Sequence, residues 1–266
     1  MWSGPLWRAD AQRDAGNDDA ASVPQPRWRQ HPESELQEVA LRILLVCATP
    51  FEVEPLVPRL RRLADTGRCS VLYSFGEHDV EVLTTGVGMV ATAAWCSRAF
   101  ASEHYDLALN LGVCGSFRPA LAPGAVVHVT ADRLAELGAE DGDGFLTIHQ
   151  LQLLGENEFP FEGGLLVNAA PPPLAPLSAL RGVTGITVNT VHGSEPTIAA
   201  IRTRYDPDVE SMEGAAFMYA SLIAGVPFAQ VRAVSNAVER RNRGAWRLDQ
   251  AIKALGAESV RLLESL

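Results

Sequence analysis

The sequence predicts a single α/β domain, a three-layer αβα sandwich around a central mixed β-sheet. Its 266 residues fit one large α/β domain or two small ones, and 47% of them are apolar, which is enough for a sizeable core. Short apolar runs alternate with segments of helical spacing, and strands of this kind are covered by helices on both faces of a sheet. One hairpin-like pair of runs adds antiparallel strands, so the sheet should be mixed.

The folded domain is expected at 41–266. Residues 1–40 are rich in Asp, Arg, Gln, Pro and Ala and follow neither a helical nor a strand period, so we expect a flexible leader there. The alternative is an arm that docks on a partner subunit through its tryptophans.

The first half of the domain contains two buried strands, a hairpin and two helices. The apolar run 41–48 predicts a strand, and apolar and charged residues at helical spacing predict a helix over 52–63. Two runs that flank Gly76-Glu77-His78 predict the hairpin. The hairpin strands, an Ala-rich helix and the next strand are expected at 71–75, 80–84, 89–102 and 106–111.

The second half continues the alternation of strands and helices. Residues 132–165 form an irregular stretch with a Gly/Asp cluster at 138–144. Strands are expected at 124–129, 185–191 and 228–234, and helices at 196–204, 213–224 and 248–263.

Charge and composition exclude several classes of function. The formal net charge is −10, whereas a protein that binds nucleic acid or an anionic membrane normally presents a basic face. The one lysine, Lys253, lies in no P-loop or Schiff-base motif. We therefore expect neither nucleic acid nor a membrane as a partner.

The cysteines and histidines give no sign of a metal or redox site. Cys47, Cys69, Cys96 and Cys114 are widely spaced, and the histidines form no H-E-x-x-H motif, so we expect no disulfide, no metal and no cofactor. There is no N-terminal apolar h-region and no apolar run of about 18 residues. The expected location is the cytoplasm.

Polar residues at four strand ends are candidates for chemistry, because ligand sites in such sheets form where strands end. Glu52 follows the first strand and is either a general base or a solvated first-turn glutamate. The small residues 112–116 either admit a ligand close to the backbone or form a plain tight turn. The carboxylate of Glu213 either points into a buried apolar contact, where it needs a hydrogen-bonding partner, or is an ordinary negative charge at a helix N-terminus. Arg232 lies inside an apolar strand and requires a partner carboxylate, and the Ser235-Asn236 pair at its end has a simple turn as its alternative.

Four segments together carry a family resemblance. They are Asn110-Leu-Gly-Val-Cys-Gly-Ser-Phe117, Gly138-Ala-Glu-Asp-Gly-Asp-Gly-Phe145, Val209-Glu-Ser-Met-Glu-Gly-Ala-Ala-Phe217 and Val231-Arg-Ala-Val-Ser-Asn-Ala-Val-Glu-Arg-Arg-Asn-Arg-Gly-Ala-Trp246. In this order they resemble the nucleoside phosphorylase and nucleosidase family, in its methylthioadenosine/S-adenosylhomocysteine nucleosidase branch. Within that branch they are most similar to the futalosine hydrolases of menaquinone biosynthesis. The resemblance implies a nucleoside phosphorylase-like fold and hydrolysis of the N-glycosidic bond of a small purine nucleoside.

The resemblance also implies roles for the candidate residues. Glu52 matches the carboxylate that activates the attacking water, and Glu213 matches the glutamate that holds the ribose hydroxyls. Val191 and His192 match the segment that stacks on the purine and meets its edge. Arg232 and Ser235 match residues that support the water and Glu52. The full set expected on the substrate side is Met212, Glu213, Val191, His192, Cys114, Gly115, Arg232 and Ser235.

Asn236 departs from the adenine-cleaving relatives, which carry an aspartate at this position. That aspartic acid protonates N7 of adenine, whereas an amide only donates a hydrogen bond. Hypoxanthine spreads developing negative charge onto its 6-carbonyl, so Asn236 favours a 6-oxopurine and is expected to be catalytic together with Glu52. The amide also pairs with the N6/N7 edge of adenine, so a nucleosidase acting on methylthioadenosine, S-adenosylhomocysteine or aminofutalosine is the alternative.

Water is the expected nucleophile. A phosphate nucleophile needs cationic clamps, and neither the loop 48–54 nor the turn 86–88 contains an arginine. A phosphorylase and a non-catalytic purine-binding relative are the remaining alternatives. The latter would be expected to lack Glu52 and Glu213, and both are present.

The resemblance raises two further expectations. Futalosine ends in an aromatic carboxylate, and Arg240, Arg241 and Arg243 either include its partner or form a solvated basic loop. Relatives commonly pair so that a neighbour closes the site, so a homo-oligomer is expected.

Overall fold

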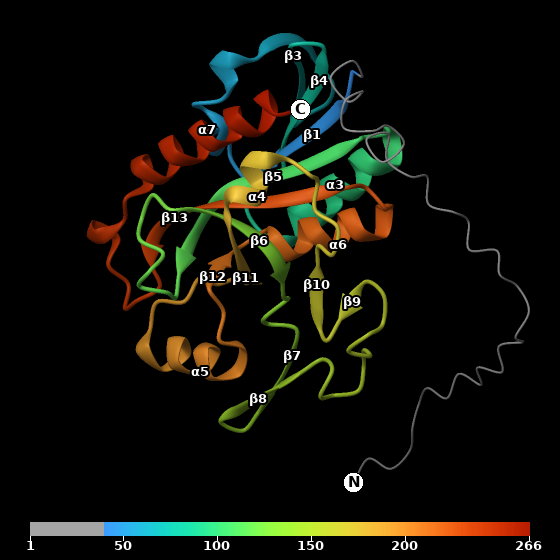
Figure 1. Cartoon of the computed structure of the whole chain (residues 1–266). Coiled ribbons are helices and arrows are strands. Elements are labelled where there is room, and N and C mark those ends of the chain that lie inside the picture. Colours follow the sequence, from blue (N-terminus) through green and yellow to red (C-terminus); the bar gives the residue numbers. More distant parts are fainter. Residues whose placement is uncertain (1–39) are drawn as a thin grey trace, which may run out of the picture.

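A mixed β-sheet forms the centre of the molecule (Figure 1). The computed structural model describes residues 40–266, so the expected leader lies almost entirely outside the described residues. Within that range, an 11-stranded sheet has the order β2-β3-β4-β1-β5-β12-β11-β6-β10-β9, and β13 pairs with β5 and β6. β1 (Arg42–Cys47) is parallel to β4 (His78–Thr84) and to β5 (Leu107–Ser116), whereas β3 (Ser70–Phe75) is antiparallel to β4. The predicted mixed sheet is confirmed.

Part of the sheet closes on itself as the ring β5-β12-β11-β6-β13. β13 (Phe228–Ala237) bonds to β5 along one edge and to β6 (Val126–Asp132) along the other. β12 (Val209–Ser211) and β11 (Arg181–Thr187) complete the ring between β5 and β6. The last residues of β5 therefore have a strand on each side, which brings three distant chain segments to one place.

Helices cover both faces of the sheet (Figure 1). Alternate residues of a strand point to opposite faces, and in β1 Ile43 and Leu45 join one core cluster while Leu44 and Val46 join the other. The first cluster lies under α7 (Leu248–Glu264) and α4 (Ala175–Ala179). The second lies under α3 (Met89–Ser102) and α6 (Gly214–Ala224), so the expected three layers are confirmed.

The prediction of a helix over residues 52–63 is wrong. The chain instead forms the single turn α2 (Pro50–Val53), the 3-10 turn η2 (Val57–Arg59) and the strand β2 (Arg61–Asp65). Pro55 and Pro58 lack a backbone N–H and clash with the preceding turn of a helix, which ends α2 after one turn. The apolar spacing of this segment reflects packing of the short turns on α7 instead.

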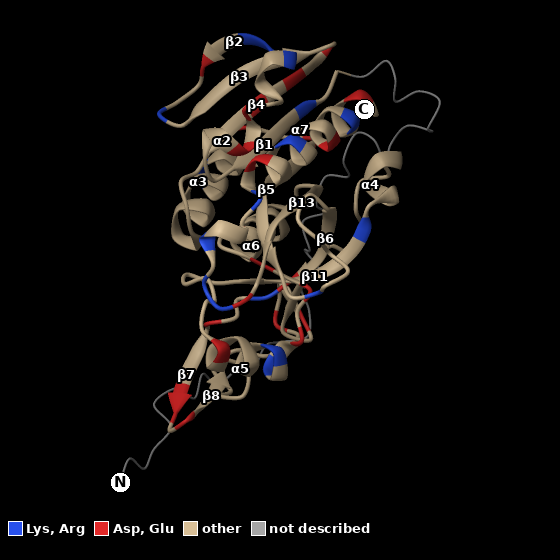
Figure 2. Ribbon diagram, turned by 90° about the vertical axis from the view of Figure 1, so that its left-hand side faces the viewer, with Lys and Arg blue, Asp and Glu red and all other residues tan. Residues whose placement is uncertain are grey.

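The stretch predicted as irregular contains short strands. β7 (Gly138–Asp141) and β8 (Gly144–Thr147) form a separate hairpin that projects at one end of the molecule beside α5 (Glu195–Tyr205) (Figure 2). The Arg204 guanidinium of α5 lies 4.1 Å from the ring centroid of Phe145 in β8. β9 (Phe161–Glu162) and β10 (Leu165–Val167) extend the main sheet.

Other element boundaries differ more modestly from the predictions. β5 continues through residues 112–116, where a tight turn was an alternative, because Gly112 and its successors pair with β13. β11 begins earlier than predicted and ends at Thr187, so 188–191 is a loop. The helices predicted at 89–102, 196–204, 213–224 and 248–263 are confirmed as α3, α5, α6 and α7.

Candidate functional site

Glu52 is a buried carboxylate held entirely by backbone N–H groups. Its Oε2 accepts hydrogen bonds from the N–H groups of Ala48 (2.8 Å) and Thr49 (3.0 Å), and its Oε1 accepts one from Val113 (3.2 Å). The side chain is 6% exposed, and burial raises its pKa above the ordinary glutamate value although Arg232 lowers it. This position, where β1 meets α2 and touches β5, holds a carboxylate that binds a proton more readily than usual.

Arg232 lies between two carboxylates at the centre of the sheet. Its guanidinium donates a hydrogen bond to Oδ1 of Asn110 and lies 3.9 Å from Oε2 of Glu213. A Cβ on Gly112 would lie 2.0 Å from Nη1 of Arg232 and 2.9 Å from Oε1 of Glu52. The glycine therefore leaves space for the guanidinium near Glu52, and the partner carboxylate expected for Arg232 is present as Glu213.

Glu213 stands at the start of α6 and is fixed from both sides. Its Oε1 accepts a hydrogen bond from the N–H of Gly88 (3.1 Å), while Ala215 at the first turn donates its N–H to Thr187 Oγ1 (2.7 Å). Thr187 in turn donates to Asp132 (3.0 Å), a fully buried residue whose pKa burial raises to about 6. The sequence reading missed Asp132, which orients the start of the helix that carries Glu213.

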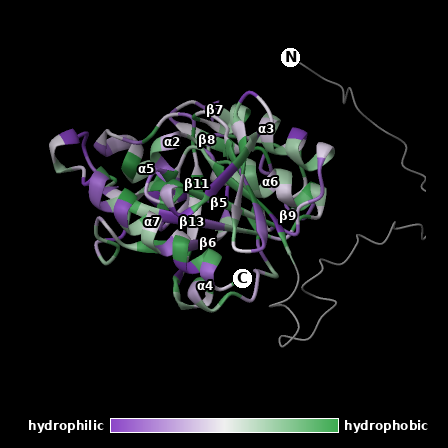
Figure 3. Cartoon of the chain, turned by 90° about the horizontal axis from the view of Figure 1, so that it is seen from above, coloured by the Kyte–Doolittle hydropathy of each residue, from purple (hydrophilic) through white to green (hydrophobic). Residues whose placement is uncertain are grey.

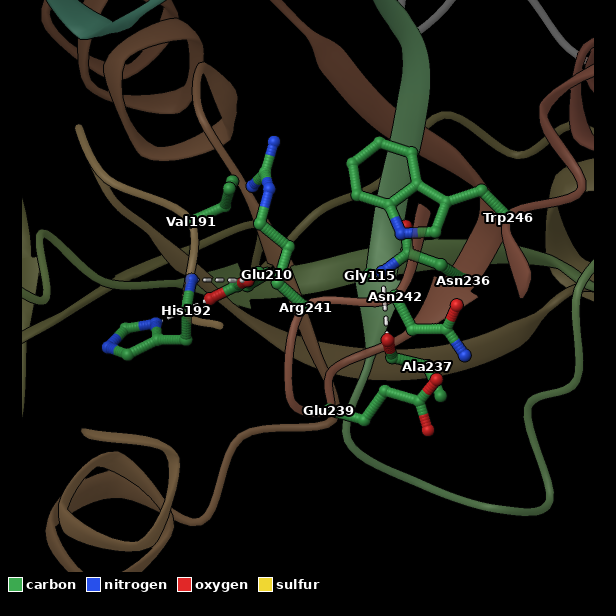
Figure 4. Close-up of a pocket in the computed structure, with 10 residues that line it drawn as sticks. All are labelled: Gly115, Val191, His192, Glu210, Asn236, Ala237, Glu239, Arg241, Asn242 and Trp246. Atoms are coloured by element: carbon green, nitrogen blue, oxygen red, sulfur yellow. Dashed lines mark hydrogen bonds and ion pairs between the residues drawn. The ribbon is translucent and has the colours of Figure 1, made fainter. Parts of the chain in front are cut away.

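Asn236 belongs to a small cavity with residues from four segments (Figure 4). Its Oδ1 accepts a hydrogen bond from Ser235 Oγ (2.8 Å), and its Nδ2 donates one to Ala237 O (2.9 Å), which leaves the second N–H of the amide free to donate to a ligand. The cavity is lined by Gly115, Val191, His192, Glu210, Asn236, Ala237, Glu239, Arg241, Asn242 and Trp246. The structure thus brings Val191 and His192, both named by the resemblance, to Asn236.

β5 connects this cavity to the charged side chains of Glu52, Arg232 and Glu213. Glu52 is not among the residues that line the cavity, but it binds the N–H of Val113, and Asn236 pairs with Gly115 two residues further along the same strand. Two residues of a strand span about 7 Å. The two positions on β5 to which Glu52 and Asn236 are tied are therefore about 7 Å apart.

The remaining predicted residues have supporting positions. Ser235 Oγ lies 3.1 Å from the carbonyl oxygen of Cys114, so its single proton is shared between this oxygen and Asn236 Oδ1. The Cys114 side chain packs in an apolar cluster with Val127 and Val234. Burial raises the pKa of the Cys114 thiol to about 12. Met212 is half-buried and is not one of the described residues that line the cavity.

The structure adds residues that the sequence reading did not select. Asn110 links Arg232 to the Val46 carbonyl, and its position as a polar residue in an apolar strand was a usable signal. Glu210 and Trp246 line the cavity, and only Glu210, a carboxylate in the buried run 209–211, offered a comparable clue. Within 40–266, no group of three or more His, Cys, Asp or Glu residues is arranged to hold a metal ion, and no helix is long and apolar enough to cross a membrane.

Comparison with known proteins matches residues 42–266 to the family model of the phosphorylase superfamily. The chain belongs to the phosphorylase superfamily. Among superfamily members, a futalosine hydrolase of Streptomyces coelicolor is 34% identical over 185 residues, which are 66% of this chain and 74% of that protein. A futalosine hydrolase of Thermus thermophilus is 33% identical over 185 residues, which are 68% of this chain and 80% of that protein.

Solved structures of other proteins share the fold of this chain. A methylthioadenosine/S-adenosylhomocysteine nucleosidase of Colwellia psychrerythraea in complex with adenine has a TM-score of 0.70 at 18% identity, covering 86% of this chain and 96% of that one. A futalosine hydrolase of Helicobacter pylori has a TM-score of 0.69 at 13% identity, covering 85% and 99%. The nucleoside phosphorylase-like fold implied by the sequence is confirmed.

Proposed function

We propose that this enzyme hydrolyses the N-glycosidic bond of futalosine and releases hypoxanthine, a step of menaquinone biosynthesis. The observation that carries the proposal is the buried Glu52, placed beside Arg232 and Glu213 and one strand segment away from Asn236. The two relatives of this chain described above are named as futalosine hydrolases and match most of the folded domain.

The geometry supports a direct attack of water on C1′. Glu52 takes a proton from the water, the oxygen bonds to C1′, and the C1′–N9 bond breaks through an oxocarbenium-like transition state. The free N–H of the Asn236 amide stabilises the charge that develops on the departing hypoxanthine, which then takes up a proton from the solvent, while Glu52 returns its proton to the solvent. Glu213 holds the ribose hydroxyls and so orients C1′ toward the water.

Chromatographic detection of the released nucleobase tests this function. The purified protein should release hypoxanthine from futalosine in phosphate-free buffer, and added phosphate should not change the rate. Adenine release from methylthioadenosine or aminofutalosine at a higher kcat/KM would establish the alternative nucleosidase. Turnover that requires phosphate would establish a phosphorylase.

The pKa of Glu52 predicts the acid limb of the pH profile. A general base works only when deprotonated, and burial raises the pKa of this carboxyl. The kcat/KM for futalosine should therefore fall, as the pH is lowered, at a higher pH than an ordinary glutamate would dictate. A pH–rate profile measures this, and an acid limb at or below the ordinary glutamate value contradicts the assignment.

Arg241 is the candidate among the three loop arginines for the carboxylate of futalosine. It lines the cavity with Asn236, whereas Arg240 and Arg243 are not among the described lining residues, and its N–H donates to the Gly193 carbonyl (3.0 Å). Because a charge-assisted hydrogen bond contributes about 1.5–3 kcal/mol, Arg241→Ala should raise KM for futalosine about tenfold or more.

Inosine provides the control for Arg241, because it has the same nucleobase without the carboxylate. The Arg241→Ala change should leave turnover of inosine unaltered, and Arg243→Ala should leave both substrates unaltered. An equal loss with inosine would show that Arg241 acts on the nucleobase rather than on the carboxylate.

We also propose that the chain forms a homo-oligomer in the cytoplasm. α3 and α6 lie side by side on one face, and α6 is built of apolar and small residues (Figure 3). Val87, Val90, Tyr219 and Ile223 of this region are exposed, with Val90 82% accessible. Such apolar exposure supports a subunit contact.

A further inference from the structure

Glu210 is a buried carboxylate to which the proposed mechanism gives no task. It is 4% exposed, and among the described residues no arginine or lysine forms an ion pair with it. Its partners are both in His192, whose N–H donates to Oε1 (3.0 Å) and whose Nδ1 donates to Oε2 (2.6 Å). Burying a carboxylate costs free energy unless its acceptor sites are used, so the arrangement calls for a reason.

Gly115 places Glu210 next to Asn236. β5 pairs with β12 on one edge and with β13 on the other, and in both ladders Gly115 is the partner residue, of Glu210 and of Asn236. A Cβ on Gly115 would lie 3.3 Å from Nδ2 of Asn236 and 3.7 Å from Cγ of Glu210. The carboxylate and the amide therefore flank one glycine, and both line the same cavity (Figure 4).

The hydrogen-bonding capacity of the pair is asymmetric. An ionised carboxylate only accepts and has about four acceptor sites, of which His192 occupies two. The Asn236 amide has a free N–H that donates. The cavity thus offers an acceptor and a donor side by side.

Purines differ at this edge. A 6-oxopurine presents the N1–H donor beside the O6 acceptor, whereas a 6-aminopurine presents the N1 acceptor beside the N6 donors. An acceptor from Glu210 and a donor from Asn236 complement the first arrangement. In the second, the carboxylate would face the N1 lone pair.

We propose that Glu210, fixed by His192, accepts the N1–H of the substrate and makes the enzyme selective for a 6-oxopurine over a 6-aminopurine. This inference rests on the proposed function and deepens it. The negative charge on Glu210 excludes adenine nucleosides, while Asn236 alone tolerates either nucleobase.

A single neutralising substitution tests the selectivity. Glu210→Gln keeps the size of the side chain but turns it into a donor and acceptor, so the enzyme should lose its preference. The ratio of kcat/KM for futalosine to that for aminofutalosine should fall at least about tenfold, in line with the discrimination of one hydrogen-bonded edge. Glu195→Gln, the same change in an exposed residue outside the cavity, should leave the ratio unaltered.

Binding of the free nucleobases gives a readout that does not depend on catalysis. The unaltered protein should bind hypoxanthine at least about tenfold more tightly than adenine by calorimetry, and Glu210→Gln should reduce this preference. Equal affinities in the unaltered protein, or an unchanged ratio in a folded Glu210→Gln variant, would overturn the inference. If futalosine is not cleaved but the Glu210-dependent preference is present, the proposed function fails and the inference stands.

Discussion

Replacement of Glu52 by Gln should lower kcat for futalosine by about 10³-fold, within the roughly 10²–10⁴-fold that general acid–base catalysis contributes. The amide cannot take the proton of the attacking water. Because the side chain is held by the N–H groups of Ala48, Thr49 and Val113, the Gln carbonyl can keep only part of these bonds, and its NH₂ group faces a donor. Steady-state kinetics on futalosine, with the affinity for hypoxanthine measured in parallel, checks the result.

Glu54→Gln is the matched control for this experiment. Glu54 is exposed and lies two residues away, so the same chemical change there should leave kcat unaltered. Hypoxanthine should bind to the Glu52→Gln variant as it does to the unaltered enzyme. A variant that retains more than about a tenth of kcat would remove Glu52 from the role of general base.

Gly112→Ala should lower kcat/KM by about 10²-fold or more, since misplacement of reacting groups by about 1 Å has effects of that size. The added Cβ would lie 2.0 Å from Nη1 of Arg232, so the guanidinium has to move away from Asn110 and Glu213. Overpacking of a buried site costs about 1–3 kcal/mol, so the melting temperature should also fall.

Gly182→Ala separates a local effect from a general cost of changing glycine in a strand. Gly182 lies in β11, and its added Cβ would approach Thr130 no closer than 3.4 Å, an ordinary contact. Activity and melting temperature should stay near those of the unaltered protein. Full activity in Gly112→Ala would show that the position of Arg232 does not matter for turnover.

The succession of strands and helices along the chain could be predicted where the apolar period was long and uninterrupted. The run that became β1 and the Ala-rich segment that became α3 were both recognised, because each carries one clear period. The segment 52–63 has a helical period as well, yet its two prolines override the apolar spacing. The prolines prevent a helix in this segment, so the apolar period alone predicted the wrong element.

The site was predictable where a charged residue interrupts an apolar run. Glu213 and Arg232 stood out for this reason, and Glu52 stood out because it follows a buried strand. The structure places Arg232 3.9 Å from Glu213, and the charge of Arg232 lowers the pKa of Glu52. Their roles in turnover stay predictions, as does that of Asn236.

Residues that come together only because the strand ring β5-β12-β11-β6-β13 closes could not be predicted from the sequence. β12 is three residues long, too short to be recognised from its period, so no local pattern placed Glu210 against Gly115. Asp132 and Gln230 meet across 98 positions of the chain, which no local pattern reveals. Such contacts follow from strand order, and strand order was not readable from the sequence.

The way in which Glu52 is held has an evolutionary consequence. Its three hydrogen-bond donors are peptide N–H groups, from residues 48, 49 and 113. Every amino acid except proline supplies such a group, so side-chain replacement at these positions does not delete a donor. The anchoring of this carboxylate is thereby insulated from sequence drift, and neighbouring residues are free to vary while its location persists.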